Sequence, residues 1–496
     1  MSHPNPSSTP KPVQHPFKTV TEVHAAFNKK IISPLEFTRE LLNSAKTSQS
    51  GAFLTLCEDR AITSAVVATD ILNQEGQVPR DRMPLFGIPL GVKDLITIEG
   101  VKTTAGSKTL ENYIPPYTAT CISLLESAGA IILGKTNLDE FGMGSSNENS
   151  AFGPVQHPTH PDRVPGGSSG GSAAAVKGGL CVAALGTDTG GSIRLPASFC
   201  GVVGLKPTYG RISRYGQIAY ASSLDQIGPL AHNVEDAALL FDVMSGHDPL
   251  DSTCSPRGRA QGYQATRVKL DWSAIRIGVP KEYMVEGLAP EVEKAIQNSL
   301  EWFKQKGARI KPISLPHSPY SVAVYYVVAV SEASSNLARM DGVRFGNRPF
   351  GAAEAKNLAE YYQKVRANFG PEVKRRIILG TFALSSGYSE AYYKRACQVR
   401  RKIKEDFDNA FREVDLIVGP VSPTTAFKVG EKISDPLQMY LNDIFTIPVN
   451  LAGLPAISVP CGNDGEGLSI GLQMIAPAFG EERLLSAAHS FFERLS

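Results

Sequence analysis

Apolar residues in the N-terminal part of the chain recur at helical spacing. Between residues 19 and 45 they mostly stand three or four positions apart, with one interruption at Ser33 and Pro34. This spacing gathers the apolar side chains on one face of a helix, and a serine followed by a proline is typical of a helix start. We therefore predict two amphipathic helices, the second beginning at Ser33, that pack on the outside of a larger core.

Short apolar runs that contain glycine and proline alternate with helical patterns along the rest of the chain. The first run covers residues 84–95 (PLFGIPLGVKDL) and predicts a buried strand followed by a turn. Residues 122–130 then predict a helix and residues 131–137 a short strand, and further strands are expected at 414–419 and 457–460. This alternation of helices and strands favours an α/β fold built on a sheet.

The chain shows no internal repeat and no clear linker. Charged residues at helical spacing in 271–306 and 361–411 predict surface helices that flank the sheet. We therefore expect a single domain over residues 17–496, with a helical excursion at about 250–410. Residues 1–16 contain five prolines and no apolar run, so they predict a flexible N-terminal tail.

Composition excludes several classes of function. The 50 Lys and Arg against 48 Asp and Glu give a net charge of +2, and no block of basic residues offers a surface for gripping nucleic acid. The seven cysteines are an odd number without any C-x-x-C pair, which favours reduced thiols in a cytoplasmic protein over disulfides or a metal site. No run reaches the roughly 18 apolar residues of a membrane span, so we expect no membrane association.

Glycine is concentrated in one part of the chain. Residues 142–210 hold 15 of the 45 glycines. Because glycine weakens ordinary helices and strands, such density indicates a backbone that approaches something closely. We expect the chemistry to lie in this segment.

Two familiar motifs match the sequence without the structural context that they need. Residues 129–136 satisfy the P-loop pattern G-x-x-x-x-G-K-[ST], but their middle residues are apolar and predict a strand where a phosphate-binding loop should be. Residues 167–171 satisfy G-x-S-x-G, which would make Ser169 the nucleophile of an α/β hydrolase. That enzyme also needs a later histidine, and none of the downstream histidines stands in a recognisable motif. The Ser169 hydrolase stays a distant alternative.

One lysine and two serines form a more specific combination. Lys93 is embedded in apolar and glycine-rich sequence, where loss of water favours the neutral, basic amine. Ser168 and Ser192 each follow a pair of glycines, whose backbone N–H groups can converge on an anion. A neutral lysine can activate a serine through a second serine without any histidine. From these residues alone, a glycine-rich structural loop with incidental serines remains the alternative.

The same glycine-rich segment resembles the amidase signature family. Residues 166–176 (GGSSGGSAAAV) and 186–211 (GTDTGGSIRLPASFCGVVGLKPTYGR) are similar to its defining block. The resemblance implies the amidase signature fold, a central mixed β-sheet covered by helices on both faces. It also implies a Ser-cisSer-Lys triad, with Ser192 as the nucleophile, Ser168 after a cis peptide bond as the proton relay and Lys93 as the base.

The resemblance extends to the loop around the nucleophile. It implies an oxyanion hole made by backbone N–H groups of Thr189, Gly190, Gly191 and Ser192. Asp188 and Arg194 flank Ser192, and we predict that they form an ion pair that holds the loop; the alternative is that they join the proton path.

Five further stretches resemble one branch of that family, the glutaminase subunits of tRNA-dependent amidotransferases. They are residues 135–153, 222–238, 331–346, 375–388 and 440–462. This resemblance implies that the chain releases ammonia from glutamine in a heterotrimer with subunits B and C. The B subunit would use ATP and Mg²⁺ to amidate Glu-tRNA(Gln) or Asp-tRNA(Asn) and would make most of the tRNA contacts. The chain itself would carry no cofactor.

Glutamine carries an α-carboxylate and an α-ammonium, so a selective site needs one cation and one anion. The resemblance assigns Arg376 to the carboxylate, Asp443 to the ammonium and Tyr325 to the lining of the pocket. A guanidinium suits a carboxylate because it can donate two parallel hydrogen bonds. The alternative is that Arg376 and Asp443 are surface or structural charges.

Two other functions remain open at this level. A stand-alone amidase could use the same triad on other carboxamides, without partners and without both Arg376 and Asp443. An inactive scaffold that positions tRNA is disfavoured by the near-neutral charge and by the intact Lys93, Ser168 and Ser192.

Overall fold

The computed structural model describes residues 16–284, 287–349 and 351–495. The strands of these residues form one 11-stranded sheet in the order β1-β3-β2-β4-β6-β5-β10-β11-β9-β7-β8. The strands are β1 (Phe53–Leu56), β2 (Pro89–Lys93), β3 (Ile131–Thr136), β4 (Ala183–Asp188), β5 (Val203–Lys206), β6 (Gln226–Ala231), β7 (Arg276–Pro280), β8 (Arg309–Ile313), β9 (Leu416–Pro420), β10 (Ala456–Asn463) and β11 (Ser469–Ile475).

The sheet is mixed, as the family resemblance implies. Strand β2 runs parallel to β3 and β4, and β7 runs parallel to β8 and β9. The other strand pairs are antiparallel. The strands predicted at 84–95, 131–137, 414–419 and 457–460 correspond to β2, β3, β9 and β10.

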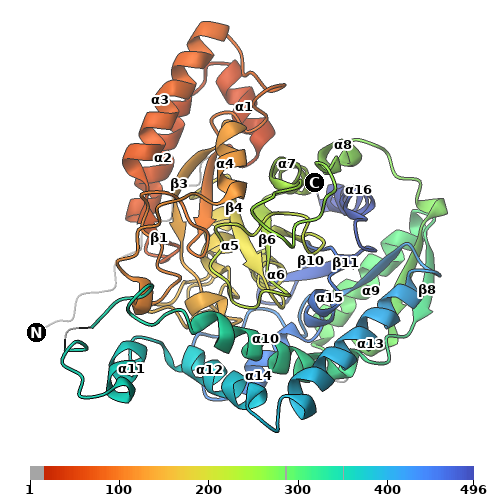
Figure 1. Ribbon diagram of the computed structural model, residues 1–496. Helices are drawn as coiled ribbons and strands as arrows, with labels where there is room; N and C mark the ends of the chain where they lie inside the picture. Colours follow the sequence, from red (N-terminus) through yellow and green to blue (C-terminus); the bar gives the residue numbers. More distant parts are fainter. Residues whose placement is uncertain (1–15, 285–286, 350, 496) are drawn as a thin grey trace, which may run out of the picture.

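Helices surround the sheet (Figure 1). Those of the N-terminal half are α1 (Val20–Asn28), α2 (Pro34–Thr47), α3 (Glu58–Glu75), α4 (Thr120–Ser127), α5 (Gly170–Lys177), α6 (Arg194–Cys200), α7 (Val234–Met244) and α8 (Gly262–Thr266). Those of the C-terminal half are α9 (Pro290–Gln305), α10 (Ser321–Leu337), α11 (Leu358–Arg366), α12 (Pro371–Leu384), α13 (Arg395–Ala410), α14 (Pro436–Tyr440), α15 (Ile447–Leu451) and α16 (Glu481–Phe492).

Both faces of the sheet are buried. In β9, Leu416 and Val418 belong to one hydrophobic cluster, while Ile417 between them belongs to a second. Successive side chains of a strand point to opposite faces, so the two clusters lie on the two sides of the sheet. Helices α7, α9 and α16 contribute to the first cluster and α10, α13 and α15 to the second. The predicted α/β fold with helices on both faces is confirmed.

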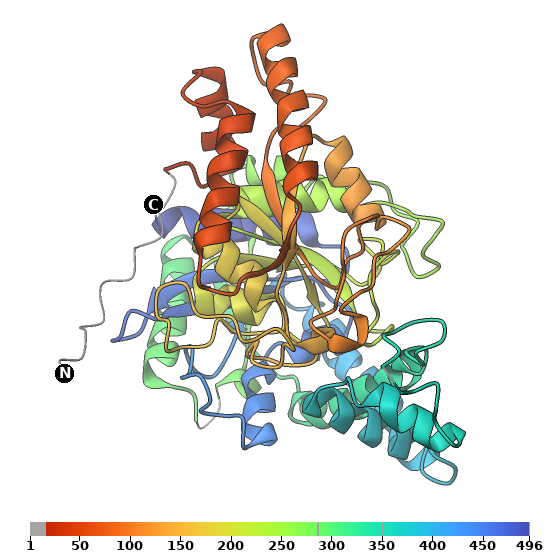
Figure 2. The ribbon, with the colours of Figure 1, turned by 90° about the vertical axis from the view of Figure 1, so that its left-hand side faces the viewer.

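The two predicted N-terminal helices are α1 and α2. Each begins with a capping box, in which Thr19 pairs with Glu22 and Ser33 with Glu36. Together with α3, they project at one end of the molecule (Figure 2). Among the described residues, no helix is long and apolar enough to cross a membrane.

Part of the organisation differs from the prediction. The stretch 271–306, predicted to be helical, contains strand β7 before α9. Strands β7 and β8 both fall inside the predicted helical excursion at 250–410, which is therefore helical only in part. They end the sheet, and three of the five residues of β8 are exposed, so an alternating apolar pattern is weak there. The predicted tail of residues 1–16 lies, except for residue 16, outside the described residues.

The start of α2 gives a test of this local structure. Ser33→Ala removes the hydroxyl that accepts the Glu36 N–H. We therefore expect the free energy of local unfolding of the first turn of α2 to fall by about 1 kcal/mol. Hydrogen exchange followed by mass spectrometry would show faster exchange at the start of α2. Thr47→Ala, at the exposed end of the same helix, is the control, and equal exchange in both variants would contradict the assignment.

Candidate active site

Lys93 ends strand β2, which lies inside the sheet between β3 and β4, and it is completely buried. Its Nζ lies 2.8 Å from Ser168 Oγ and 2.9 Å from Ser169 Oγ, and 3.4 Å from the carbonyl oxygen of Thr187. Burial lowers the pKa of Lys93 from 10.5 to about 7, against the opposing effect of nearby carboxylates. Near neutral pH the amine is therefore available as a base.

Ser168 lies on a tightly packed turn before α5. The peptide bond between Gly167 and Ser168 is cis, as the family resemblance implies. A Cβ atom on Gly167 would stand 2.0 Å from Asp139 Oδ2, so only glycine fits at this position. The Asp139 carboxylate in turn accepts backbone N–H groups from Asn147 and Asn149. Asp139 thus braces the turn that carries Ser168.

Ser192 lies in the loop between β4 and α6, and 8% of its surface is exposed. Its carbonyl oxygen accepts the N–H of Ser169 at 3.1 Å, which ties the two serine-bearing segments together. Strands β2 and β4 are parallel neighbours, so the residues after their carboxyl ends meet at one edge of the sheet. This topology brings the Ser192 loop to Lys93 and Ser168.

The glycines of this loop are packed against side chains that come from far along the sequence. A Cβ on Gly190 would stand 2.8 Å from the Tyr325 ring, and one on Gly191 would stand 2.6 Å from Asp443 Oδ1. Gly191 also has φ of +152°, which side chains rarely allow. Two predicted substrate-binding residues, Tyr325 and Asp443, therefore lie directly beside the predicted oxyanion loop.

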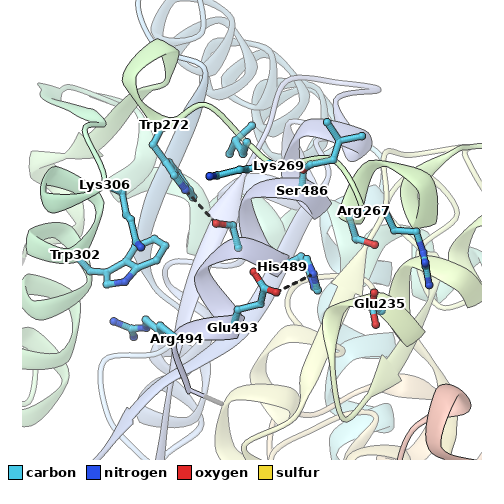
Figure 3. Close-up of a pocket in the computed structure, with 14 residues that line it drawn as sticks. Glu235, Arg267, Lys269, Trp272, Trp302, Lys306, Ser486, His489, Glu493 and Arg494 are labelled. Carbon is cyan, nitrogen blue, oxygen red and sulfur yellow. Dashed lines mark hydrogen bonds and ion pairs between the residues drawn. The ribbon is translucent and has the colours of Figure 1, made fainter.

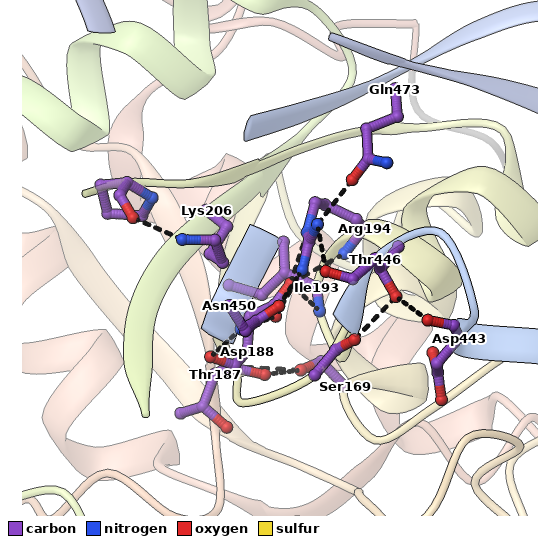
Figure 4. Close-up of polar contacts among 12 residues, drawn as sticks. Ser169, Thr187, Asp188, Ile193, Arg194, Lys206, Asp443, Thr446, Asn450 and Gln473 are labelled. Carbon is purple, nitrogen blue, oxygen red and sulfur yellow. Dashed lines mark hydrogen bonds and ion pairs between the residues drawn. The ribbon is translucent and has the colours of Figure 1, made fainter. Parts of the chain in front are cut away.

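Asp188 and Arg194 form the predicted ion pair across the loop (Figure 4). Arg194 Nε and Nη2 each lie 3.0 Å from a carboxylate oxygen of Asp188. Burial alone would raise the pKa of Asp188, but the guanidinium lowers it to about 2. Arg194 also donates to Gln473 of β11 and to the carbonyl oxygen of Thr446. The pair fixes the loop to the sheet, and none of the side-chain hydrogen bonds that Asp188 and Arg194 make among the described residues reaches Lys93, Ser168 or Ser192.

Arg376 is a buried residue of α12, which excludes a surface charge. Its Nε donates to Glu372 at 2.8 Å and its Nη1 donates to the Tyr220 hydroxyl at 2.6 Å. The rings of Tyr220, Tyr326 and Tyr440 surround the guanidinium at 5.2–5.6 Å from their centres. These contacts orient a cation inside the molecule.

Asp443 supplies the opposite charge. Its Oδ2 accepts the Ser145 hydroxyl, while its Oδ1, beside Gly191, accepts no hydrogen bond among the described residues. Burial raises the pKa of Asp443 from 3.8 to about 7. A buried carboxylate oxygen without a partner is costly, and a cationic group of a ligand would satisfy it.

Two sequence alternatives are not supported by this geometry. Residues 131–136 of the P-loop pattern form strand β3, and Lys135 pairs with Asp94 at 2.8 Å. Ser169 is fully buried and donates to the Thr187 carbonyl oxygen, and none of its described contacts is a histidine.

A separate cavity of about 670 Å³ among α7, α8, α9 and α16 contains none of the predicted site residues (Figure 3).

Several residues that complete the site were missed by sequence reasoning. Tyr220 and Glu372 hold Arg376, Ser145 holds Asp443, and Asp139 braces Ser168. Ser145 and Asp139 lie in the 135–153 stretch that resembles the family branch, which is a signal for their region but not for their contacts. Tyr220 stands outside all the matched stretches.

Covalent labelling distinguishes the two candidate nucleophiles. We expect phenylmethanesulfonyl fluoride to add one sulfonyl group to the wild-type chain and to Ser169→Ala, but none to Ser192→Ala. Mass spectrometry of the intact chain and its peptides would locate the adduct. An adduct that persists in Ser192→Ala would reject Ser192 as the nucleophile.

The depressed pKa of Lys93 predicts how that labelling depends on pH. The neutral amine is the active form, so the rate should be low at pH 5, rise through about pH 7 and level off above it. Lys93→Arg keeps the charge at all these pH values, so we expect a rate lowered by about 100-fold with no rise.

Lys206 provides the matched control for this profile, because burial lowers its pKa to about 7 as well. Lys206→Met should leave the midpoint of the labelling profile in place. A midpoint near pH 7 that survives in Lys93→Arg would show that another group is the base.

Comparison with known proteins shows the family of the chain. The family model described as "Amidase" matches residues 36–485. The A subunit of glutamyl-tRNA(Gln) amidotransferase from Geobacter sp. (strain M21) is 52% identical over 476 residues, which cover 95% of this chain and 96% of that protein.

Solved structures show the same fold. The crystal structure of the corresponding glutamyl-tRNA(Gln) amidotransferase chain from Thermotoga maritima is 39% identical, with a TM-score of 0.71 and 95% of each chain covered. A peptide amidase in complex with chymostatin is 27% identical, with a TM-score of 0.79 and coverage of 97% and 98%. A family model that spans most of the chain and relatives that share half of its residues lead to one conclusion: this chain belongs to the amidase family.

Proposed function

We propose that the chain is the glutaminase subunit of a tRNA-dependent amidotransferase. The observation that carries the proposal is a buried pair of opposite charges: Asp443 lies beside Gly191 of the Ser192 loop, and Arg376 is close enough to Asp443 to act on its pKa. Free glutamine has a carboxylate and an ammonium beside its scissile amide, and this pair offers a partner to each.

The charges of the two residues suit these roles. Arg376 is held by Glu372 and Tyr220, so its orientation is set before a carboxylate arrives. Asp443 has a pKa raised to about 7 by burial, and a bound ammonium would lower that pKa again because opposite charges favour ionisation. A ligand that carries both a carboxylate and an ammonium would therefore balance the charges of both Arg376 and Asp443.

The reaction begins with glutamine bound and Lys93 neutral. Lys93 takes the proton of Ser168 as Ser168 takes that of Ser192, and Ser192 Oγ attacks the side-chain amide carbon. Backbone N–H groups of the loop from Thr189 to Ser192 stabilise the oxyanion. The C–N bond then breaks, the proton returns to the departing nitrogen, and water hydrolyses the glutamyl ester on Ser192.

The names of the relatives support a proposal for where the ammonia goes. They are named as the A subunit of an amidotransferase, which implies a complex of several subunits. We propose that subunits B and C complete a heterotrimer, that the B subunit uses ATP and Mg²⁺ to amidate the tRNA-bound glutamate or aspartate, and that the tRNA contacts lie mainly on that partner. The absence of a basic block in the sequence of this chain supports this division, and we propose that the complex is cytoplasmic.

A stand-alone amidase is the second candidate, and the fold alone favours it equally. The peptide amidase matches with a TM-score of 0.79, but its sequence identity is 27%, against 52% for the amidotransferase relative. The buried charge pair Arg376 and Asp443 favours a free amino acid as the substrate.

Ammonia release from glutamine tests the proposal. We expect release by the wild-type chain to rise when subunits B and C are co-expressed, and to vanish in Ser192→Ala. Arg376→Lys should raise KM for glutamine by about tenfold or more, since a single ammonium cannot replace the bidentate guanidinium.

The outcomes separate the two candidates. Partner-independent hydrolysis that prefers amides without an α-carboxylate, unchanged by Arg376→Lys, would establish a stand-alone amidase. Glutamine hydrolysis that persists in Ser192→Ala would overturn the mechanism.

A further inference from the structure

Asp225 lies where the catalytic loop and the support of Arg376 come together. We propose that Asp225 is a positioning residue that joins the Ser192 loop to Tyr220, so that the nucleophile and the anchor for the substrate carboxylate keep a fixed spacing. This inference rests on the proposed glutaminase function for the identity of the substrate.

The first link runs to the loop. Asp225 directly precedes β6, and β6 pairs with β4 so that Gln226 stands opposite Asp188. Asp225 therefore lies beside the point where the chain leaves β4 and enters the loop. The Thr189 hydroxyl donates to Asp225 Oδ1 at 2.7 Å.

The second link runs to the arginine. Asp225 Oδ2 accepts the N–H of Tyr220 at 2.9 Å, and the N–H of Ala221 lies 3.1 Å from both carboxylate oxygens. The Tyr220 hydroxyl accepts from Arg376 Nη1. The Asp225 carboxylate thus connects the oxyanion loop with the Arg376 guanidinium through three hydrogen bonds and the Tyr220 side chain.

The position of Asp225 suits it to hold neighbouring groups in place and not to take part in the reaction. It is almost completely buried, and its described partners are one hydroxyl and backbone N–H groups, with neither Ser168 nor Ser192 among them. A purely local turn-stabilising role would account for the bonds to residues 220 and 221. It would not account for the bond to Thr189, which is 36 positions away in the sequence.

Two readouts separate the two links. The rate of Ser192 sulfonylation by phenylmethanesulfonyl fluoride reports on the loop and needs no glutamine. KM for glutamine, measured with subunits B and C present, reports on the carboxylate anchor.

Thr189→Val keeps the shape of the side chain but removes the donor to Asp225, and Tyr220→Phe removes the hydroxyl that holds Arg376.

We expect Thr189→Val to lower the sulfonylation rate and kcat by about tenfold at nearly constant KM, and Tyr220→Phe to raise KM by about tenfold at a nearly constant sulfonylation rate. Asp225→Asn should change both readouts, because its amide places a donor against N–H groups that need an acceptor.

Asp251→Asn is the matched control. Asp251 also accepts a threonine hydroxyl and two backbone N–H groups, from Thr253 and Arg214, but it contacts no residue of the loop in these bonds. This variant should leave both readouts within twofold of the wild type, a margin of about 0.4 kcal/mol.

The proposal is overturned if Asp225→Asn behaves like Asp251→Asn, or if it changes only one readout. If Asp225→Asn does not fold, as judged by circular dichroism, an unchanged sulfonylation rate in Thr189→Val overturns the proposal by itself. Failure of the glutaminase function would appear differently, as absence of glutamine hydrolysis by the wild-type complex while sulfonylation proceeds.

Discussion

The removal of Lys93 from water is the constraint on which the rest of the site depends. A lysine in contact with solvent or with a carboxylate would stay protonated and could not accept a proton from serine. Lys93 ends a strand whose five residues are all buried, and its Nζ contacts two serine hydroxyls and a carbonyl oxygen. Those neutral partners satisfy the amine without restoring its charge.

The acidic residues around Lys93 are arranged consistently with this constraint. Asp139, Asp188 and Asp225 all act to raise the pKa of Lys93 from a distance. Each is committed to other groups: Asp139 to backbone N–H groups, Asp188 to Arg194, and Asp225 to Thr189 and the backbone near Tyr220. Because these carboxylates bind other groups, none of them pairs directly with Lys93. Their effect of raising the pKa of Lys93 therefore stays smaller than the lowering effect of burial.

How far the sequence predicts this structure depends on whether a feature is local. Lys93, Ser168 and Ser192 stand in short glycine-rich motifs, and the capped helices and buried strands show their own periodicity, so all of these could be found from the chain alone. Strand β7 could not, because it has only five residues, which include a glycine and a proline, and it lies next to the last strand of the sheet. The residues that hydrogen-bond to Arg376 and Asp443 could not be predicted either, because Tyr220 is 156 positions from Arg376 and Ser145 is 298 positions from Asp443. Only the folded chain brings such partners together.

The division between sheet and helices also explains how one fold can serve different amides. The triad lies on β2 and on the turns beside β4, within the central sheet, and the fold is shared with a peptide amidase at a TM-score of 0.79. Tyr325, Arg376 and Asp443 come instead from α10, α12 and the segment after α14, outside the sheet, and Tyr325 and Asp443 lie directly against the loop. Because fold alone does not determine substrate, selectivity must depend on how these segments are held against the loop. Gly190 and Gly191 permit that contact directly, since any side chain there would displace Tyr325 or Asp443.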